Sequence, residues 1–256
     1  TALSDQGKTA KLGFLTYVIG LGISGVAFAE NHSMSGLIVM AVTFIIGWFL
    51  EQELKFKKQS VLDLWKHFPT ICVAASLDDM GDRAAIIRSG TDWAQVEQNI
   101  QDLKRECPHI DFMISPTLSA MNVWNFCEFH RYMVEQGFID PKDFNLNILQ
   151  GPQDYRIDML PADLKEKFKR EFEEHIEWLK PIDTIQRAVG GFQGAIQFMM
   201  ATDNSHLLVD FWNSVNDLDW SRSESLLSVV PELEAIIEYR PTDTRTPLGR
   251  THRILK

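Results

Sequence analysis

The sequence predicts an α/β protein made of a pair of apolar helices, about three parallel strand-helix units and a C-terminal helical region. Three observations lead to this fold class: two long uncharged runs, then an alternation of short apolar runs with amphipathic patterns, and finally helical periodicity alone. The expected domains are residues 1–58, 59–182 and 183–238. Residues 239–256 lack apolar periodicity and are expected to form a flexible tail.

Composition and charge exclude some classes of function. The chain is 45% apolar and 23% charged, as in ordinary globular proteins. Its formal net charge of -10 argues against a nucleic-acid partner, which would require a basic face. The three cysteines, Cys72, Cys107 and Cys127, are too few and too far apart for a disulfide framework. They indicate a reducing compartment, the cytosol.

The N-terminal region predicts a transmembrane hairpin. Residues 12–29 and 31–50 carry no charged side chain and are separated only by Glu30. Each run is close to the roughly 20 apolar residues that cross a bilayer. Lysines flank the pair of runs on both sides, at Lys8, Lys11, Lys55, Lys57 and Lys58. They predict that both ends stay in the cytoplasm, so that the protein is membrane-located with its C-terminal domain in the cytoplasm.

Other interpretations of this region stay open. The two runs could form a buried hairpin in the core of a soluble protein. A signal peptide is disfavoured because the second run follows the first too closely. Gly20, Gly22 and Gly25 fit a dinucleotide-binding fingerprint, but residues 42–47 offer no acidic side chain to hold a ribose. Close packing of two membrane helices explains the glycines better.

After residue 58 the pattern alternates between strands and helices. Strands are expected over 70–76, 110–115 and 146–149, and helices over 91–103, 123–137, 163–180 and 205–218. Three successive strand-helix units indicate parallel strands with helices packed outside them. In a sheet of three strands, the 70–76 strand would be an unpaired apolar edge that favours self-association.

Several motifs agree in order and spacing with a known family. They are Ser76-Leu77-Asp78-Asp79, Ile87 to Trp93 (IRSGTDW), Val96 to Ile100 (VEQNI), Thr117 to Asn122 (TLSAMN) and the segments Leu218-Asp219 and Pro231-Glu232-Leu233. Together they resemble the C-terminal half of twitch-type radical S-adenosylmethionine (radical SAM) proteins, over roughly residues 60–238. Asp79 departs from the pattern, because the family usually has glycine there.

The resemblance implies a partial (β/α) barrel that carries S-adenosylmethionine across the C-terminal ends of its strands. Ser76 and Asp78 would then hydrogen-bond ribose or amino-acid groups of the cofactor. Arg88 would meet its carboxylate, since a guanidinium matches a carboxylate bidentately. Thr117 and Asn122 would occupy the next strand end. Each residue also has a purely structural interpretation, as part of a turn or as a surface arginine.

The family's catalytic motif is missing. A [4Fe-4S] cluster needs three thiolates in a C-x-x-x-C-x-x-C loop, whereas the cysteines here lie 35 and 20 positions apart. We therefore expect no cluster and no metal site. Cys127 and His130 form a lone C-x-x-H, which predicts helix packing rather than a metal. His175, which lies among glutamates, is expected on a solvated helix face.

These features predict a truncated or fused radical SAM-like protein that lacks radical chemistry and in which S-adenosylmethionine binding is either retained or lost. The alternative is a non-enzymatic, membrane-anchored interaction module that docks on a partner protein, which completes its sheet. A third interpretation is an artificial join near residues 55–60, where composition and resemblance both change.

Overall fold

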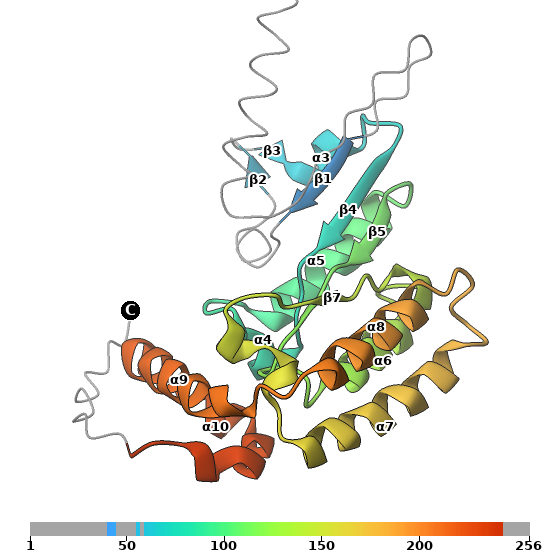
Figure 1. Cartoon of the computed structure of the whole chain (residues 1–256). Coiled ribbons are helices and arrows are strands. Elements are labelled where there is room, and N and C mark those ends of the chain that lie inside the picture. The colour runs from blue at the N-terminus through green and yellow to red at the C-terminus, as the bar shows by residue number, and fades with distance from the viewer. Residues whose placement is uncertain (1–39, 45–54, 57–58, 243–256) are drawn as a thin grey trace, which may run out of the picture.

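The computed structural model describes residues 40–44, 55–56 and 59–242, and it places short strands at one end of a largely helical chain (Figure 1). The strands are β1 (Met40–Phe44), β2 (Lys55–Phe56), β3 (Gln59–Ser60), β4 (Ile71–Ala75), β5 (Asp111–Ile114), β6 (Thr117–Leu118) and β7 (Asn147–Ile148). The α-helices are α3 (Val61–Trp65), α4 (Gly81–Ile87), α5 (Trp93–Glu106), α6 (Phe126–Glu135), α7 (Ala162–Leu179), α8 (Arg187–Ala201), α9 (Leu208–Arg222) and α10 (Leu226–Val229). The 3-10 helices are η2 (Pro141–Asp143), η3 (Gln153–Tyr155), η4 (Ile157–Met159), η5 (Ser205–Leu207) and η6 (Pro231–Tyr239).

The strands pair in parallel, in small sheets. The main sheet has the order β1-β4-β5, and β6 pairs with β7 separately. Pro116 separates β5 from β6 and has no backbone N–H to donate to a ladder. An isolated parallel bridge between Ile114 and Phe144 lies beside this break. The antiparallel pair β2 and β3 is two residues long on each side.

The predicted transmembrane hairpin is wrong. Residues 40–44 belong to the second apolar run, yet they form β1 and pair with β4, with Val42 opposite Val73. An uninterrupted apolar run suits a strand buried on both faces as well as a helix, and Val42, Thr43 and Phe44 favour a strand. Residues 1–39 and 45–54, which make up most of the predicted hairpin, lie outside the described residues.

The predicted membrane location is corrected together with the transmembrane hairpin. No helix in the described ranges is both long and apolar enough to cross a bilayer. The longest of them, α7, spans 18 residues but carries charged side chains throughout. A helix of this composition cannot be solvated by lipid tails.

The predicted barrel fragment of three strand-helix units is also wrong. The strand predicted at 146–149 is the two-residue β7, which lies outside the main sheet. Two helices, α4 and α5, follow β4, and helices occupy most of the chain beyond β7. The 70–76 strand is not an edge either, because β4 lies between β1 and β5.

Several helices lie close to their predicted positions. α7 covers most of the predicted 163–180 helix, and α9 overlaps the 205–218 helix. α5 begins two residues later than the expected 91–103 helix, because Asp92 is its N-cap and the Asp92 carboxylate accepts from the backbone N–H of Gln95 at 3.2 Å. Arg240, at the start of the predicted tail, donates to the Asn216 side chain, while residues 243–256 lie outside the described residues.

The core is centred on aromatic side chains from α6, α7 and α8. Phe126, Phe172 and Phe192 are buried, and the Phe192 ring contacts each of the other two edge to face. α8 approaches the chain near β7 so closely that a Cβ atom on Gly191 would lie 2.9 Å from Cβ of Leu146. A glycine is therefore required at this crossing.

Candidate functional site

Four of the five residues predicted to bind the cofactor meet at the C-terminal end of β4. The Asp78 carboxylate accepts a hydrogen bond from Nε of Arg88 at 2.8 Å and forms an ion pair with its Nη2 at 2.7 Å. The other Asp78 oxygen accepts from the backbone N–H of Thr117 at 2.8 Å. Both carboxylate oxygens therefore have partners within the protein: Oδ2 meets both Arg88 nitrogens, and Oδ1 meets the Thr117 amide.

Asn122 closes the network from the other side. Its Nδ2 donates to the carbonyl oxygens of Asp78 at 2.8 Å and Thr117 at 3.0 Å. Its Oδ1 accepts from the backbone N–H of Ser119 at 2.8 Å and from the Ser119 hydroxyl at 3.2 Å. Asn122 is fully buried, and both ends of its amide are occupied. The side chain joins the β4 loop to the end of β6.

Ser76 does not belong to this network. It is half-buried after β4, and none of the hydrogen bonds recorded for the described part of the chain involves its hydroxyl. Nε and Nη2 of Arg88 are engaged by Asp78, and its role toward a cofactor stays a prediction. The four converging side chains, Asp78, Arg88, Asn122 and Ser119, are referred to here together with the Thr117 backbone as the strand-end network. It fixes a loop and leaves few donors or acceptors for a ligand.

Asp79, the residue that departs from the family pattern, lies beside this network. It is buried, and its Oδ1 accepts from the Asn125 amide at 2.7 Å and from the backbone N–H of Met80 at 2.9 Å. Its Oδ2 is buried without a hydrogen bond. Burial raises the pKa of Asp79 to about 6, against the lowering effects of Asn125, Met80 and the nearby Arg83.

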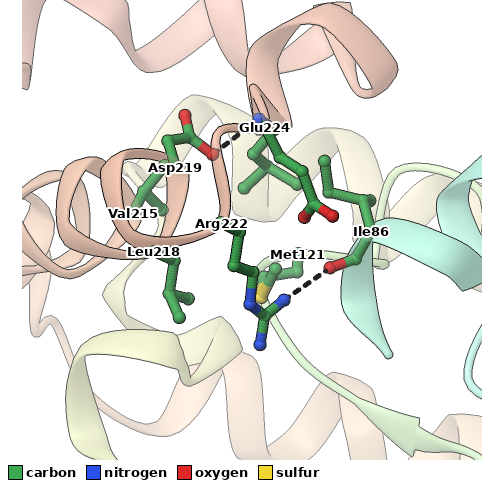
Figure 2. A pocket seen from close by; sticks show the side chains of 8 residues that line it. Ile86, Met121, Val215, Leu218, Asp219, Arg222 and Glu224 are labelled. Atoms are coloured by element: carbon green, nitrogen blue, oxygen red, sulfur yellow. Dashed lines mark hydrogen bonds between the residues drawn. The ribbon is translucent and has the colours of Figure 1, made fainter. Parts of the chain in front are cut away.

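A small pocket lies between α4, α9 and α10. Figure 2 shows Arg222 reaching across it toward the carbonyl oxygen of Ile86, to which its Nη1 donates at 3.1 Å. Asp219 lines the same pocket, and its carboxylate accepts from the backbone N–H of Leu226 at 2.8 Å. The cavity measures about 10 Å³, which is room for about one water molecule. Pockets that hold cofactors are typically about 300 Å³ or larger.

The cysteines occupy three separate elements. Cys72 lies in β4, Cys107 follows α5, and Cys127 lies in α6, and all three are free. Burial raises the pKa of each thiol, most strongly that of Cys127. Protonated thiols are poor metal ligands. Within the described residues no group of three or more metal-ligating side chains comes together.

A buried histidine pair was not predicted. Nε2 of His175 lies 3.0 Å from Nδ1 of His130, and both residues are fully buried. The predicted solvated position of His175 is therefore wrong. The signal was present in the sequence, because His175 follows Phe172 by three positions and precedes Leu179 by four, on the buried face of α7. The His130 ring stacks on Phe144, with a centroid distance of 3.8 Å.

A further buried carboxylate, that of Asp158, lies far from the strand-end network in the sequence. Asp158 pairs with Arg156 and accepts from the Thr202 hydroxyl at 3.1 Å and from the Asn204 amide at 2.9 Å. Lys165 donates to the Thr202 carbonyl oxygen at 2.6 Å. These bonds hold η4 against the end of α8, so this cluster too is satisfied internally.

Comparisons with known proteins assign no family: no family model, no curated protein and no solved structure matches this chain.

Proposed function

We propose that the chain is a non-catalytic binding module, a radical SAM-like fragment whose strand-end residues hold its own loops instead of a cofactor. The observation that carries the proposal is the contact of one Asp78 carboxylate oxygen with both Nε and Nη2 of Arg88, at 2.8 and 2.7 Å. A cofactor carboxylate that paired with the Nε and Nη2 edge of Arg88 would displace Asp78 and leave a buried carboxylate unpaired. That exchange is unfavourable, because an uncompensated buried charge costs several kcal/mol.

The chemistry of the thiols supports the absence of radical catalysis. A [4Fe-4S] cluster needs several thiolates within a few ångström of one another. Cys72, Cys107 and Cys127 lie on different elements, and burial raises the pKa of each. The three thiols therefore give no support to the cluster that the family uses.

The open sheet supports a binding role. β4 is paired on both sides, whereas β1 pairs only with β4 among the described strands. The edge of a parallel sheet presents unpaired backbone donors and acceptors that another chain can use. We propose that the partner is a protein, either another polypeptide or a second copy of this chain. The net charge of -10 disfavours nucleic acid.

The experiment is anaerobic reconstitution of the whole chain with iron and sulfide, followed by visible absorption and an assay for 5'-deoxyadenosine. We expect no stoichiometric cluster and no product. A stable cluster with product formation would overturn the proposal. Light scattering over a range of concentrations tests the binding role separately, and it should show self-association or, with a partner protein added, a complex of defined mass.

A second candidate function is weak binding of S-adenosylmethionine without cleavage. The observation that favours it is the convergence of four predicted positions, Asp78, Arg88, Thr117 and Asn122, at one strand end. About a third of the Arg88 side chain remains exposed. This candidate requires Arg88 to exchange Asp78 for the cofactor, so binding should be weak and should disappear in Arg88→Ala.

A further inference from the structure

α8 presents a face without charge to solvent. It lies beside α7 (Figure 1), and residues 188–202 carry no charged side chain. The exposed side of α7, by contrast, carries charges in every turn, at Glu166, Arg170, Glu173 and Glu177. The whole chain has a net charge of -10, so a helix of 15 residues with an uncharged exposed face stands apart from its surface. Exposed faces that avoid charge mark interaction sites.

The exposed positions lie on one side of the helix. Gly190, Gln193, Gln197 and Met200 are exposed, and their spacing of three and four residues places them on one face. Phe192 and the other buried residues of α8 point to the opposite side. A Cβ atom on Gly190 would meet nothing within 4 Å. Neither glutamine amide has a hydrogen bond recorded within the described residues, so the face is open to another chain.

Opposite charges stand at the two ends of this face. Arg187 is the first residue of α8, and Asp203 follows its last residue by two positions. Among the described residues neither has an ion-pair partner: Arg187 donates to the Lys142 carbonyl oxygen at 3.4 Å, and Asp203 accepts from the Ser205 N–H at 3.0 Å. Each charge lies at the unfavourable end of the α8 dipole, which is positive at its N-terminus. An antiparallel second helix would reverse both relations.

We propose that the α8 face binds the same face of a second copy of this chain, in antiparallel orientation about a two-fold axis level with Ala195. This inference rests on the proposed binding role and names its partner. In a two-fold pair, each residue before the axis faces the residue at the same distance beyond it in the other copy. Arg187 of each copy then lies opposite Asp203 of the other, and each charge meets the favourable end of the facing helix dipole.

The same register pairs the rest of the face. Gln193 lies opposite Gln197 of the second copy, and an amide both donates and accepts, so it can hydrogen-bond another amide. Gly190 lies opposite Met200, and the missing side chain leaves room for the longer one. Two copies of an acidic chain repel one another over most of their surface, but not at an uncharged face. The α8 face is therefore complementary to itself, which favours a second copy over an unrelated chain.

The dimer should be weak. At 1.5 Å per residue the helix is about 22 Å long, so its face is smaller than the roughly 800 Å² per partner of stable complexes. A weak dimer is detected best by covalent trapping, which captures contacts that form only part of the time.

Disulfide trapping of the whole chain tests the register. Gln193→Cys and Gln197→Cys are oxidised separately and as an equimolar mixture, and covalent dimers are measured by non-reducing electrophoresis. The mixture should give several-fold more dimer than either variant alone, because the two positions face each other across the axis. Gln136→Cys, which is exposed at the end of α6, should give no more dimer than the unmodified chain. Equal yields from the mixture and the separate variants, or no yield above that of the unmodified chain, would overturn the proposal.

Charge exchange at the ends of the face tests the same pairing by sedimentation equilibrium. Arg187→Asp or Asp203→Arg places like charges opposite each other twice in the dimer, and should raise its dissociation constant about tenfold. The double variant Arg187→Asp/Asp203→Arg restores opposite charges and should bring the constant back to that of the unmodified chain. A double variant as weak as the single variants would contradict the antiparallel pairing. Self-association that none of these substitutions changes would refute the α8 contact and leave the proposed binding role standing.

Discussion

Nε2 of His175 lies 3.0 Å from Nδ1 of His130 in the aromatic core, where neither ring meets solvent. Burial lowers the pKa of His175 to about 3, and burial together with the charge of His175 holds the pKa of His130 well below its ordinary value. The folded state therefore favours the neutral form of both rings.

Acid should destabilise the protein through this pair. Because the folded pKa values lie below the unfolded value of about 6.5, the unfolded chain binds more protons between pH 6.5 and pH 3. The contribution of the two neutral rings to the free energy of unfolding is complete above pH 6.5. As the pH falls below 6.5, the free energy of unfolding decreases by up to about 1.4 kcal/mol per pH unit for each ring. Urea unfolding at pH 7.5 and at pH 5 measures this decrease in the free energy of unfolding.

The double variant His130→Phe/His175→Phe is the control for this prediction, because it removes both titrating rings and keeps an aromatic core. Its stability should fall less between pH 7.5 and pH 5 than that of the unmodified chain. Asp79 acts in the opposite direction, because its folded pKa of about 6 exceeds the unfolded value of 3.8. Its contribution is complete below pH 3.8 and is lost as the pH rises through 6. An equal loss of stability in the double variant and in the unmodified chain would contradict the role of the histidine pair.

The crossing of α8 over the chain near β7 should tolerate no side chain at Gly191. A Cβ atom there would lie 2.9 Å from Cβ of Leu146, which cannot rotate away. We expect Gly191→Ala to lower the free energy of unfolding by about 1 to 3 kcal/mol. Gly194→Ala, on the same helix with open space around it, should instead stabilise by up to about 1 kcal/mol. Thermal unfolding of the two variants compares them, and equal effects would show that the crossing is not close.

The side chains of the strand-end network should matter for stability, whereas Ser76, which lies outside the network, should not. Asn122→Ala leaves the Ser119 amide and two carbonyl oxygens without their partner, and should cost about 2 to 4 kcal/mol. Arg88→Ala should cost about 2 to 3 kcal/mol, because the Asp78 carboxylate stays buried without its cation.

Ser76→Ala provides the matched control for these two variants. It should change the free energy of unfolding by less than about 0.5 kcal/mol, since no bond of its hydroxyl is recorded. Chemical unfolding of the three variants ranks them by their free energy of unfolding. A cost for Ser76→Ala as large as that for Asn122→Ala would mean that the serine has a partner outside the described residues.

Local periodicity predicted the helices best. The face formed by Leu164, Phe168, Phe172 and Leu179 placed α7 almost to the residue, since a 3.6-residue period is specific to helices. An uninterrupted apolar run has no such periodicity, so it does not distinguish a buried strand from a membrane helix. For this reason the sequence predicts a membrane helix over residues 40–44, which pair with β4 instead.

The cofactor role of the strand-end residues stays a prediction, whereas the place where several of them meet was expected from the motifs. Short motifs at strand ends brought Asp78, Arg88 and Asn122 to one place, because the ends of neighbouring parallel strands meet. Their mutual bonds were not predictable, since a motif does not reveal whether its polar groups face a ligand or one another. The contact of Arg83 with Glu232 spans 149 positions, and nothing in the sequence pattern links the two residues.

The central claim is that the strand end is closed by its own side chains. Isothermal titration of the whole chain with S-adenosylmethionine tests it most directly, with Arg88→Ala titrated in parallel. The strand-end network predicts no saturable heat for either protein at millimolar cofactor, because the Arg88 guanidinium is held by Asp78. Saturable binding by the unmodified chain that disappears in Arg88→Ala would contradict it and establish the strand end as a cofactor site.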